Sequence, residues 1–280
     1  MINLKYDGTF SKRFSQQRKN LDARLKSLQK DASPDSIHDV RTSIRRVEAA
    51  FQLLPKRFRK RSKACRYISG SKKLFKSMSP VRDIDILISN LADLQSISTV
   101  KTVLMTLRSE RDRRIREILG RAKSLNELKA PKLRKNKLAS FQIMKRKRRV
   151  LQGLQWRIAE LVPLVLQDYE KVDEVHNLRK YCKRLRYTLE LVLSEEERDF
   201  AGLMEEWQKA LGSVRDLDLT AEYIAKNGLE SELKQYLEGL KKKRERSLES
   251  FVQSAKARLN SSGDLIPIAK TVSSYRVFYG

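Results

Sequence analysis

Three segments of the sequence occur twice, in the same order and at nearly one separation. His38 and His176 begin the first matched pair and lie 138 residues apart, whereas the other two pairs are offset by 133 residues. Ordered matches at a nearly constant offset predict two copies of one structural unit. The matched segments are 37–54 with 175–192, 79–87 with 212–220, and 104–115 with 237–248.

Apolar residues recur at helical spacing along almost the whole chain, and no segment shows the period-2 alternation of a strand. Only 10 Gly and 6 Pro occur in 280 residues, too few for a turn-rich all-β fold. We therefore predict an all-α protein, a single domain over residues 1–280 built from two helical repeats. The predicted parts are a first repeat over 11–125, a linker over 126–136, a second repeat over 137–260 and an irregular C-terminal tail over 261–280.

The expected helices follow this periodicity, and two carry clear end signals. Ser33-Pro34-Asp35 is typical of a helix start, and Asn227-Gly228 is typical of a helix end. The predicted helices are 11–31, 35–54, 57–78, 85–94, 97–123, 137–162, 172–193, 195–211, 217–227 and 229–260.

The chain is strongly basic, with 61 Lys and Arg against 34 Asp and Glu and a net charge of +27. Residues 1–150 hold 40 basic and 13 acidic residues, so the whole surplus lies in the first half. A polyanion would relieve the self-repulsion of such a segment. A solvated basic surface is the alternative interpretation.

Several protein classes do not fit the sequence. No apolar run is long enough to span a bilayer, and the first residues lack a signal-peptide pattern, so we expect no membrane association. Cys65 and Cys182 form neither a disulfide framework nor a zinc-ligand spacing. We therefore expect a reduced, cytoplasmic protein without a metal site or a cofactor.

The first repeated segment places histidine and basic residues on one helix face. On a helical wheel, His38, Arg41 and Arg45 fall together, with Arg46 beside them, opposite the apolar set. That apolar set is Val40, Ile44, Val47, Phe51 and Leu54.

The second copy repeats the map. Its stripe consists of His176, Arg179, Lys180, Lys183 and Tyr187, flanked by Arg184 and Arg186. A solvated helix face usually mixes Glu with Lys, whereas these stripes are almost entirely basic. Guanidinium groups bind two phosphate oxygens at once, so the stripes favour a phosphate ligand over an ordinary basic surface.

The third repeated segment puts an arginine on an apolar face. Arg111 falls within the apolar stripe of helix 97–123 with Arg108 at its edge, and Arg244 and Lys241 take the matching places in the second copy. A charge on a core face requires a partner. The partner is either an Asp of the Arg-Asp-x-Asp segments or an anion, and we favour Asp pairing with the arginine tips still reaching ligand. Those segments contain Arg82, Asp83, Asp85, Arg215, Asp216 and Asp218.

Metal binding by the Asp pairs and catalysis by the histidines are two other roles for these residues. The Asp pairs lack a third ligand for a metal and follow expected helix ends, where capping the next helix is the commoner role. The acidic residues nearest to His38 and His176, Asp39 and Glu174, point elsewhere on the helical wheel, which favours phosphate binding by a neutral imidazole over catalysis. Stacking aromatics, typical of single-stranded nucleic-acid binders, are almost absent from the stripes.

The repeated motifs resemble the CHAD family, the conserved histidine α-helical domain. The resemblance rests on His38-x-x-Arg41-x-x-x-Arg45-Arg46, its copy from His176 to Tyr187, and the two Arg-Asp-x-Asp segments, and covers about residues 11–260. The two copies differ at two of these positions. Lys183 stands in the second copy where the first has Arg45, and Glu48 stands in the first copy where the second has Arg186. The resemblance implies two four-helix-bundle-like halves, related by a pseudo-twofold, around a basic central channel.

The same resemblance implies binding of inorganic polyphosphate without hydrolysis, and association with polyphosphate granules. We therefore predict a non-enzymatic polyphosphate-binding protein. A nucleic-acid-binding protein is the main alternative, and a phosphohydrolase that uses His38 or His176 is a further one. The predicted ligand-binding residues are His38, Arg41, Arg45, Arg46, Arg108, Arg111, His176, Arg179, Lys180, Lys183, Arg184, Arg186, Tyr187, Lys241 and Arg244.

Overall fold

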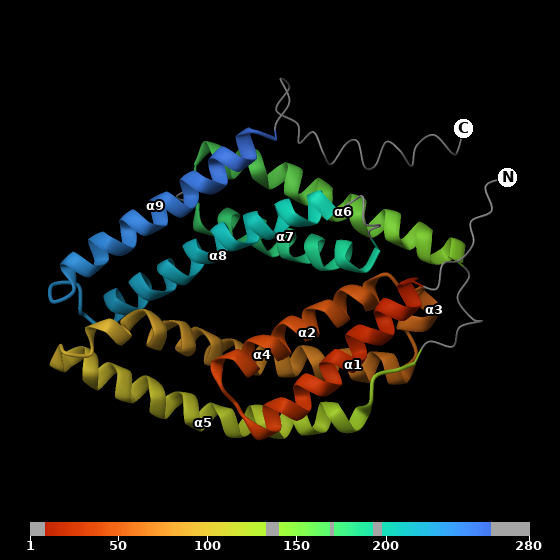
Figure 1. Ribbon diagram of the computed structural model, residues 1–280, viewed down its shortest axis with the longest axis horizontal. Helices are drawn as coiled ribbons and strands as arrows, with labels where there is room; N and C mark the ends of the chain where they lie inside the picture. Colours follow the sequence, from red (N-terminus) through yellow and green to blue (C-terminus); the bar gives the residue numbers. More distant parts are fainter. Residues whose placement is uncertain (1–8, 133–139, 169–170, 193–197, 259–280) are drawn as a thin grey trace. The chain divides into compact units, whose positions relative to one another are not determined.

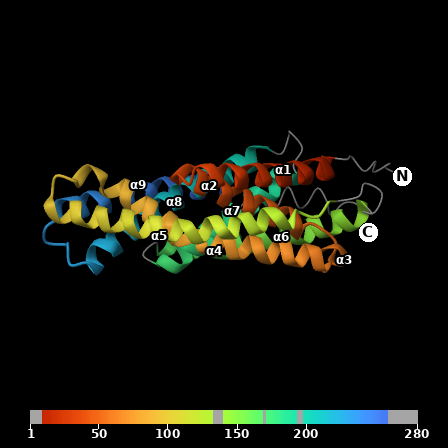
Figure 2. The same ribbon diagram turned by 90° about the horizontal axis from the view of Figure 1, so that it is seen from below.

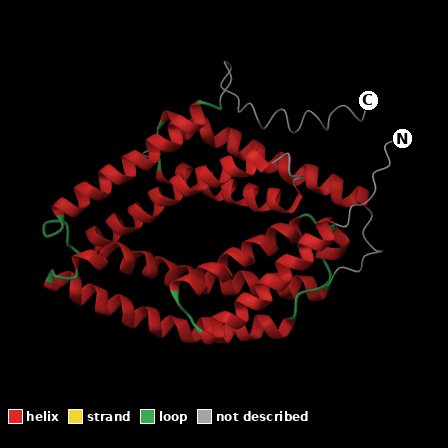
Figure 3. Cartoon of the chain, in the orientation of Figure 1, coloured by secondary structure: helices red, strands yellow, loops and turns green. Residues whose placement is uncertain are grey.

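The computed structural model describes residues 9–132, 140–168, 171–192 and 198–258, and over these ranges it contains helices and no strand (Figure 3). The predicted all-α class is confirmed for this part of the chain. Within these residues, no helix is both long and apolar enough to cross a bilayer. The helices are α1 (Thr9–Lys30), α2 (Pro34–Gln52), α3 (Lys56–Arg59), α4 (Ser62–Leu91), the 3₁₀ helix η1 (Ala92–Leu94), α5 (Ser98–Leu128), α6 (Ser140–Gln167), α7 (Val172–Val192), α8 (Arg198–Lys226) and α9 (Lys234–Lys256).

The chain forms two compact units, Met1–Arg146 and Lys147–Gly280, so the boundary falls inside α6. The first part of the expected linker is helical, because α5 continues to Leu128. The rest of that segment from residue 133, and the tail 261–280, lie outside the described residues.

The first unit is a four-helix bundle of α1, α2, α4 and α5. Helix α4 runs alongside α5, as both views show, while α2 packs on α1 and α4 (Figures 1 and 2). Aromatic side chains join three of these helices. The Phe51 ring lies 5.4 Å from Phe14 and 6.3 Å from Tyr67, measured between ring centroids, and all three side chains are buried. Burial of such large apolar side chains stabilises the bundle most.

The second unit has one apolar core to which α6, α7, α8 and α9 all contribute. Trp207 of α8 is fully buried and meets Phe251 of α9 edge to face at 5.3 Å. Its indole N–H donates to the Ser254 hydroxyl at 3.1 Å, which satisfies the only polar atom of that side chain. The core cluster is Leu154, Ile158, Val162, Val165, Val175, Leu178, Cys182, Leu185, Leu189, Leu203, Met204, Trp207, Leu211, Val214, Leu248, Phe251 and Ala255.

The expected helix end signals are present. Ser33 caps α2, because its hydroxyl accepts from the Ser36 N–H at 3.3 Å, and Pro34 occupies the first turn. Gly228 follows α8 with a φ of +69°, the left-handed conformation that glycine adopts without strain. The Leu229 N–H donates to the Ile224 carbonyl at 3.1 Å, which closes the helix end.

Two predicted helix breaks are wrong. Helix α4 continues across residues 79–84 with Pro80 inside it, and α8 likewise continues through Gly212. Proline removes one helical N–H and crowds the preceding turn, which is why the sequence indicated a break. The carbonyl that loses its helical N–H is that of Lys76, and α4 continues past it, while the preceding Phe75 carbonyl accepts from the Ser79 hydroxyl and from Arg41.

Candidate functional site

The first unit presents the first histidine face, which consists of His38, Arg41, Arg45 and Arg46 on α2. Its helix phase is as predicted, because the matching apolar positions from Val40 to Phe51 are buried. His38 is exposed and the three arginines are intermediate in exposure. The His38 ring nitrogen Nε2 lies 3.5 Å from the Thr42 hydroxyl, one turn along the helix.

Arg41 and Arg45 of this face lie against α4. The Arg41 guanidinium donates through Nη1 to the Phe75 carbonyl at 3.1 Å and to the Ser79 hydroxyl at 3.0 Å. The guanidinium carbons of Arg41 and Arg45 lie 4.2 and 3.9 Å from the centre of the Phe75 ring. Arg45 also reaches Glu48 at 3.4 Å. The arginines are therefore held in place by α4.

The second unit presents the second histidine face, which consists of His176, Arg179, Lys180 and Lys183 on α7. Arg179 lies against α8, where a Cβ placed on Gly212 would be 3.5 Å from the Arg179 Nε. Gly212 matches Ser79 in the repeat, so both arginines meet the same turn of the neighbouring helix.

His176 is neutral at physiological pH. Burial lowers its pKa from 6.5 to about 4, with help from the charges of Lys180, Arg179 and Arg215, while Asp173 opposes the shift. Its Nδ1 is buried without a hydrogen-bond partner within the described residues. A neutral imidazole among cations can donate or accept one hydrogen bond but is a poor proton donor at pH 7.

The structure corrects the placement of Arg186 and Tyr187. Tyr187 was expected on the outer stripe but is buried, only 2% exposed. The Arg186 guanidinium lies 5.0 Å from the Tyr187 ring centre and pairs with Glu190 at 3.7 Å and Glu205 at 3.2 Å. These two residues therefore contact other residues of the second unit. The helical wheel describes α7 alone and could not include Glu205 of α8. Arg184, in contrast, is exposed as expected.

Each unit also contains an internal arginine–aspartate ion pair. Arg111 Nε donates to Asp85 at 2.6 Å and Arg111 Nη2 donates to the Ala32 carbonyl at 2.7 Å. In the second unit Arg244 Nε donates to Asp218 at 2.7 Å. Only 15% of each arginine side chain is exposed. Pairing with Asp, which the sequence favoured, therefore accounts for both arginines on apolar faces.

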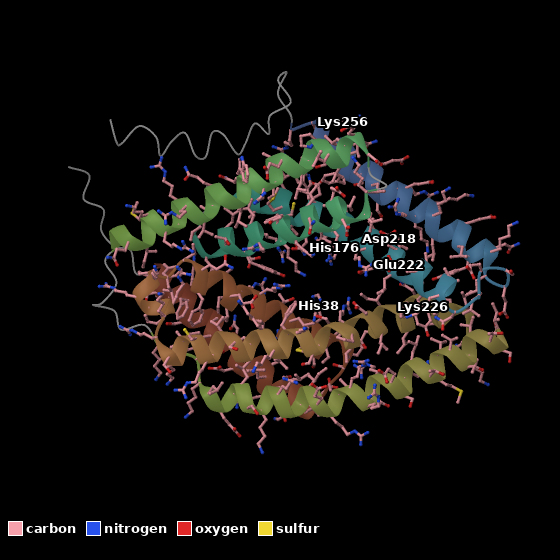
Figure 4. The ribbon with its side chains drawn as sticks, turned by 180° about the vertical axis from the view of Figure 1, so that it is seen from behind. His38, His176, Asp218, Glu222, Lys226 and Lys256 are labelled. Atoms are coloured by element: carbon pink, nitrogen blue, oxygen red, sulfur yellow. The ribbon has the colours of Figure 1, made fainter. Side chains whose placement is uncertain are left out.

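The remaining predicted residues divide between exposed and helix-interior positions. Arg108 and Lys241 are exposed beside the ion pairs. Asp83 and Asp85 lie inside α4, and Asp216 and Asp218 inside α8, so the proposed capping of a following helix is wrong. It was wrong because the breaks expected before them do not exist. Figure 4 labels Asp218 and Glu222, one turn apart on α8, and Glu222 accepts from Arg215 at 3.2 Å.

Three residues near the two faces were missed from the sequence: Phe75, Ser79 and Gly212 contact the arginines. Arg215, expected in structural pairing or capping, pairs with Glu222 and also contributes to the electrostatic field at His176. The offset of 133 residues already aligned Ser79 with Gly212. The missing information was the continuity of α4 and α8, which brings these turns beneath α2 and α7.

The fold and the two histidine faces together define an all-helical protein with a duplicated cationic helix. The family model of the CHAD domain matches residues 12–225, most of the chain, so the chain belongs to the CHAD domain family. A solved structure described as the crystal structure of the CHAD domain from the plant Ricinus communis is similar at 16% identity. The match covers 95% of this chain and 90% of that chain, with a TM-score of 0.49. No curated protein matches the chain.

Proposed function

We propose that this protein binds inorganic polyphosphate through its two histidine faces and does not hydrolyse it. The observation that carries the proposal is the repeated arrangement of a histidine and basic residues on α2 and on α7. Arg41 lies against Ser79 of α4, and Arg179 lies against the equivalent residue of α8, Gly212. Membership of the CHAD family supports it. Phosphate oxygens accept charge-assisted hydrogen bonds from guanidinium groups, and a bare phosphate chain needs no base-stacking surface.

A binding role suits the chemistry of His176 better than a catalytic one. Burial, together with the neighbouring cations, lowers the pKa of His176 to about 4, so the imidazole is deprotonated at pH 7 and is a poor general acid. The charges named around it are predominantly positive, which suits an anionic ligand. The phosphohydrolase alternative is tested by assaying phosphate release in the same samples as binding.

The central experiment compares Arg41→Ala and Arg179→Ala with the wild type in a polyphosphate-binding titration. Loss of a hydrogen bond to a charged group predicts about a 10- to 100-fold weaker affinity for each variant. Arg121→Ala and Arg157→Ala are matched controls, because both arginines are exposed, belong to neither histidine face and pair with a glutamate of their own helix. Unchanged affinity in both face variants would refute the site.

Competition with single-stranded RNA and duplex DNA separates this proposal from the nucleic-acid alternative. Polyphosphate binding should weaken steeply with salt, because bound phosphates release counterions, in the manner of a nucleic-acid backbone. Ready displacement of polyphosphate by RNA would favour the alternative. Imaging of a fluorescent fusion beside a polyphosphate stain tests the further proposal that the protein associates with polyphosphate granules.

A further inference from the structure

Phe75 of α4 is an aromatic side chain that lies against two arginines of the first histidine face. Its ring centre lies 4.2 Å from the Arg41 guanidinium carbon and 3.9 Å from that of Arg45. These distances are well inside the roughly 6 Å range of cation–π attraction, and they require each guanidinium to lie over a ring face.

The contact with Phe75 offsets the repulsion between two positive charges of this face. Arg41 and Arg45 are one helical turn apart, where two like charges repel and destabilise the helix. No acidic residue occurs between Glu48 and Asp83, so the residues of α4 around Phe75 carry no carboxylate. The negative face of an aromatic ring attracts both cations without neutralising either. The ring therefore attracts both arginines without adding a negative charge that would compete with an anionic ligand.

The contact also restricts the two side chains. Arg41 is fixed at three points, by the Phe75 ring, the Phe75 carbonyl and the Ser79 hydroxyl. The planar guanidinium carries five N–H donors, and the hydrogen bonds of Arg41 to Phe75 and Ser79 both use Nη1 alone. Ordering a long side chain before the ligand arrives lowers the entropic cost of binding.

The matching position of the second unit holds no aromatic residue. The repeat aligns Phe75 with Gln208, and the alignment holds on both sides, because Leu74 and Met78 match the buried residues Trp207 and Leu211. Packing of the helices therefore does not demand an aromatic residue at this position. The ring is specific to the first histidine face.

We propose that Phe75 is a positioning residue of the phosphate site, which holds Arg41 and Arg45 as a preorganised pair of guanidinium groups. The inference rests on the proposed polyphosphate binding. Phe75 acts through the two arginines and contacts no phosphate itself.

The test measures polyphosphate affinity for Phe75→Leu and Phe75→Tyr in the full chain. Loss of the ring in Phe75→Leu should weaken binding about 5- to 30-fold, whereas Phe75→Tyr keeps the ring and should remain within about twofold of the wild type. Gln208→Leu is the matched control in the second unit and should not change the affinity. Thermal denaturation of each variant shows that it remains folded at the assay temperature.

A double-mutant cycle separates positioning from general destabilisation. In an Arg41→Ala/Arg45→Ala background, Phe75→Leu should have no further effect on affinity, because the groups that the ring holds are gone. A loss that persists in this background overturns the inference. So does a Phe75→Leu variant with wild-type affinity while Arg41→Ala/Arg45→Ala is weakened. If Arg41→Ala/Arg45→Ala itself binds normally, the proposed site on this face is wrong, which is a distinct result.

Discussion

The two units use the same internal ion pair but build their histidine faces differently. Arg111 with Asp85 and Arg244 with Asp218 have the same spacing of 26 residues, with contact distances of 2.6 and 2.7 Å. By contrast, Arg41 meets a phenylalanine and a serine, whereas Arg179 meets a glycine. The comparison indicates that the internal ion pair has the same geometry in both units, whereas the residues that contact Arg41 and Arg179 differ between the units.

The largest effect is expected from breaking one ion pair at a time. Asp85 is 1% exposed and Asp218 14% exposed, measured on the side chains. Asp85→Ala leaves Arg111 without its carboxylate and should lower the free energy of unfolding by about 3–5 kcal/mol. Asp218→Ala should cost less, because water reaches Asp218. Chemical denaturation followed by circular dichroism measures both.

A paired replacement checks the cause of this loss. Asp85→Leu combined with Arg111→Met removes both charges and should be more stable than Asp85→Leu alone. Equal losses for Asp85→Ala and Asp218→Ala would contradict the difference in burial between the two units.

A smaller effect is expected from pH, because His176 titrates differently in the folded and unfolded chain. Its pKa falls from 6.5 to about 4 on folding, so between these values the unfolded chain binds a proton that the folded one does not. Its contribution to stability is complete above pH 6.5 and is lost as the pH falls towards 4. The imidazole is partly exposed, so solvent screening limits the loss to on the order of 1 kcal/mol.

Unfolding measured at several pH values, with His176→Gln beside the wild type, tests this expectation. The variant should lose less stability than the wild type between pH 6.5 and 4. Curves that stay parallel over that interval would show that His176 is not shifted. The carboxylates titrate equally in both proteins, so their effects cancel in the difference in stability between the wild type and His176→Gln.

The smallest changes in stability are expected when Ser79 and Gly212, the matching residues that Arg41 and Arg179 lie against, are each replaced by alanine. Ser79→Ala removes the hydroxyl that accepts from Arg41 and should destabilise the first unit by about 0.5–1.5 kcal/mol. Gly212→Ala should instead stabilise the second unit by about 0.5–1 kcal/mol, because glycine is unfavourable inside a helix. The added Cβ would lie 3.5 Å from Arg179 Nε, an ordinary contact.

Melting temperatures of the two variants measure these changes, which should have opposite signs. Destabilisation by Gly212→Ala would mean that Arg179 requires the open space over the glycine. In that case the arginines of the two units would depend on different features of the same turn.

Much of the fold followed from periodicity and repetition. The apolar positions of α2 and α7 gave the buried sides of both helices, and the charge on the apolar face of α5 and α9 indicated the pairing of Arg111 and Arg244. These features are local to one helix or depend on a buried charge that needs a partner, so the sequence contains them.

The features that sequence reasoning missed depend on contacts between helices. Pro80 suggested a break in α4, because a local rule includes the lost helical N–H but not the packing of α4 against α2 and α5. Tyr187 lay on the polar side of the helical wheel, and only the fold shows that it is buried. A helical wheel describes one helix in isolation and contains no information about the helices packed against it.

The position of Trp207 gives the protein an optical asymmetry. The chain contains two tryptophans, Trp156 and Trp207, and both belong to the second unit. Trp207 is fully buried beside Phe251, whereas Trp156 is 57% exposed. Intrinsic tryptophan emission therefore reports on the second unit alone, while far-ultraviolet circular dichroism reports on the helices of both. A difference between the two melting curves would resolve the unfolding of each unit without any label.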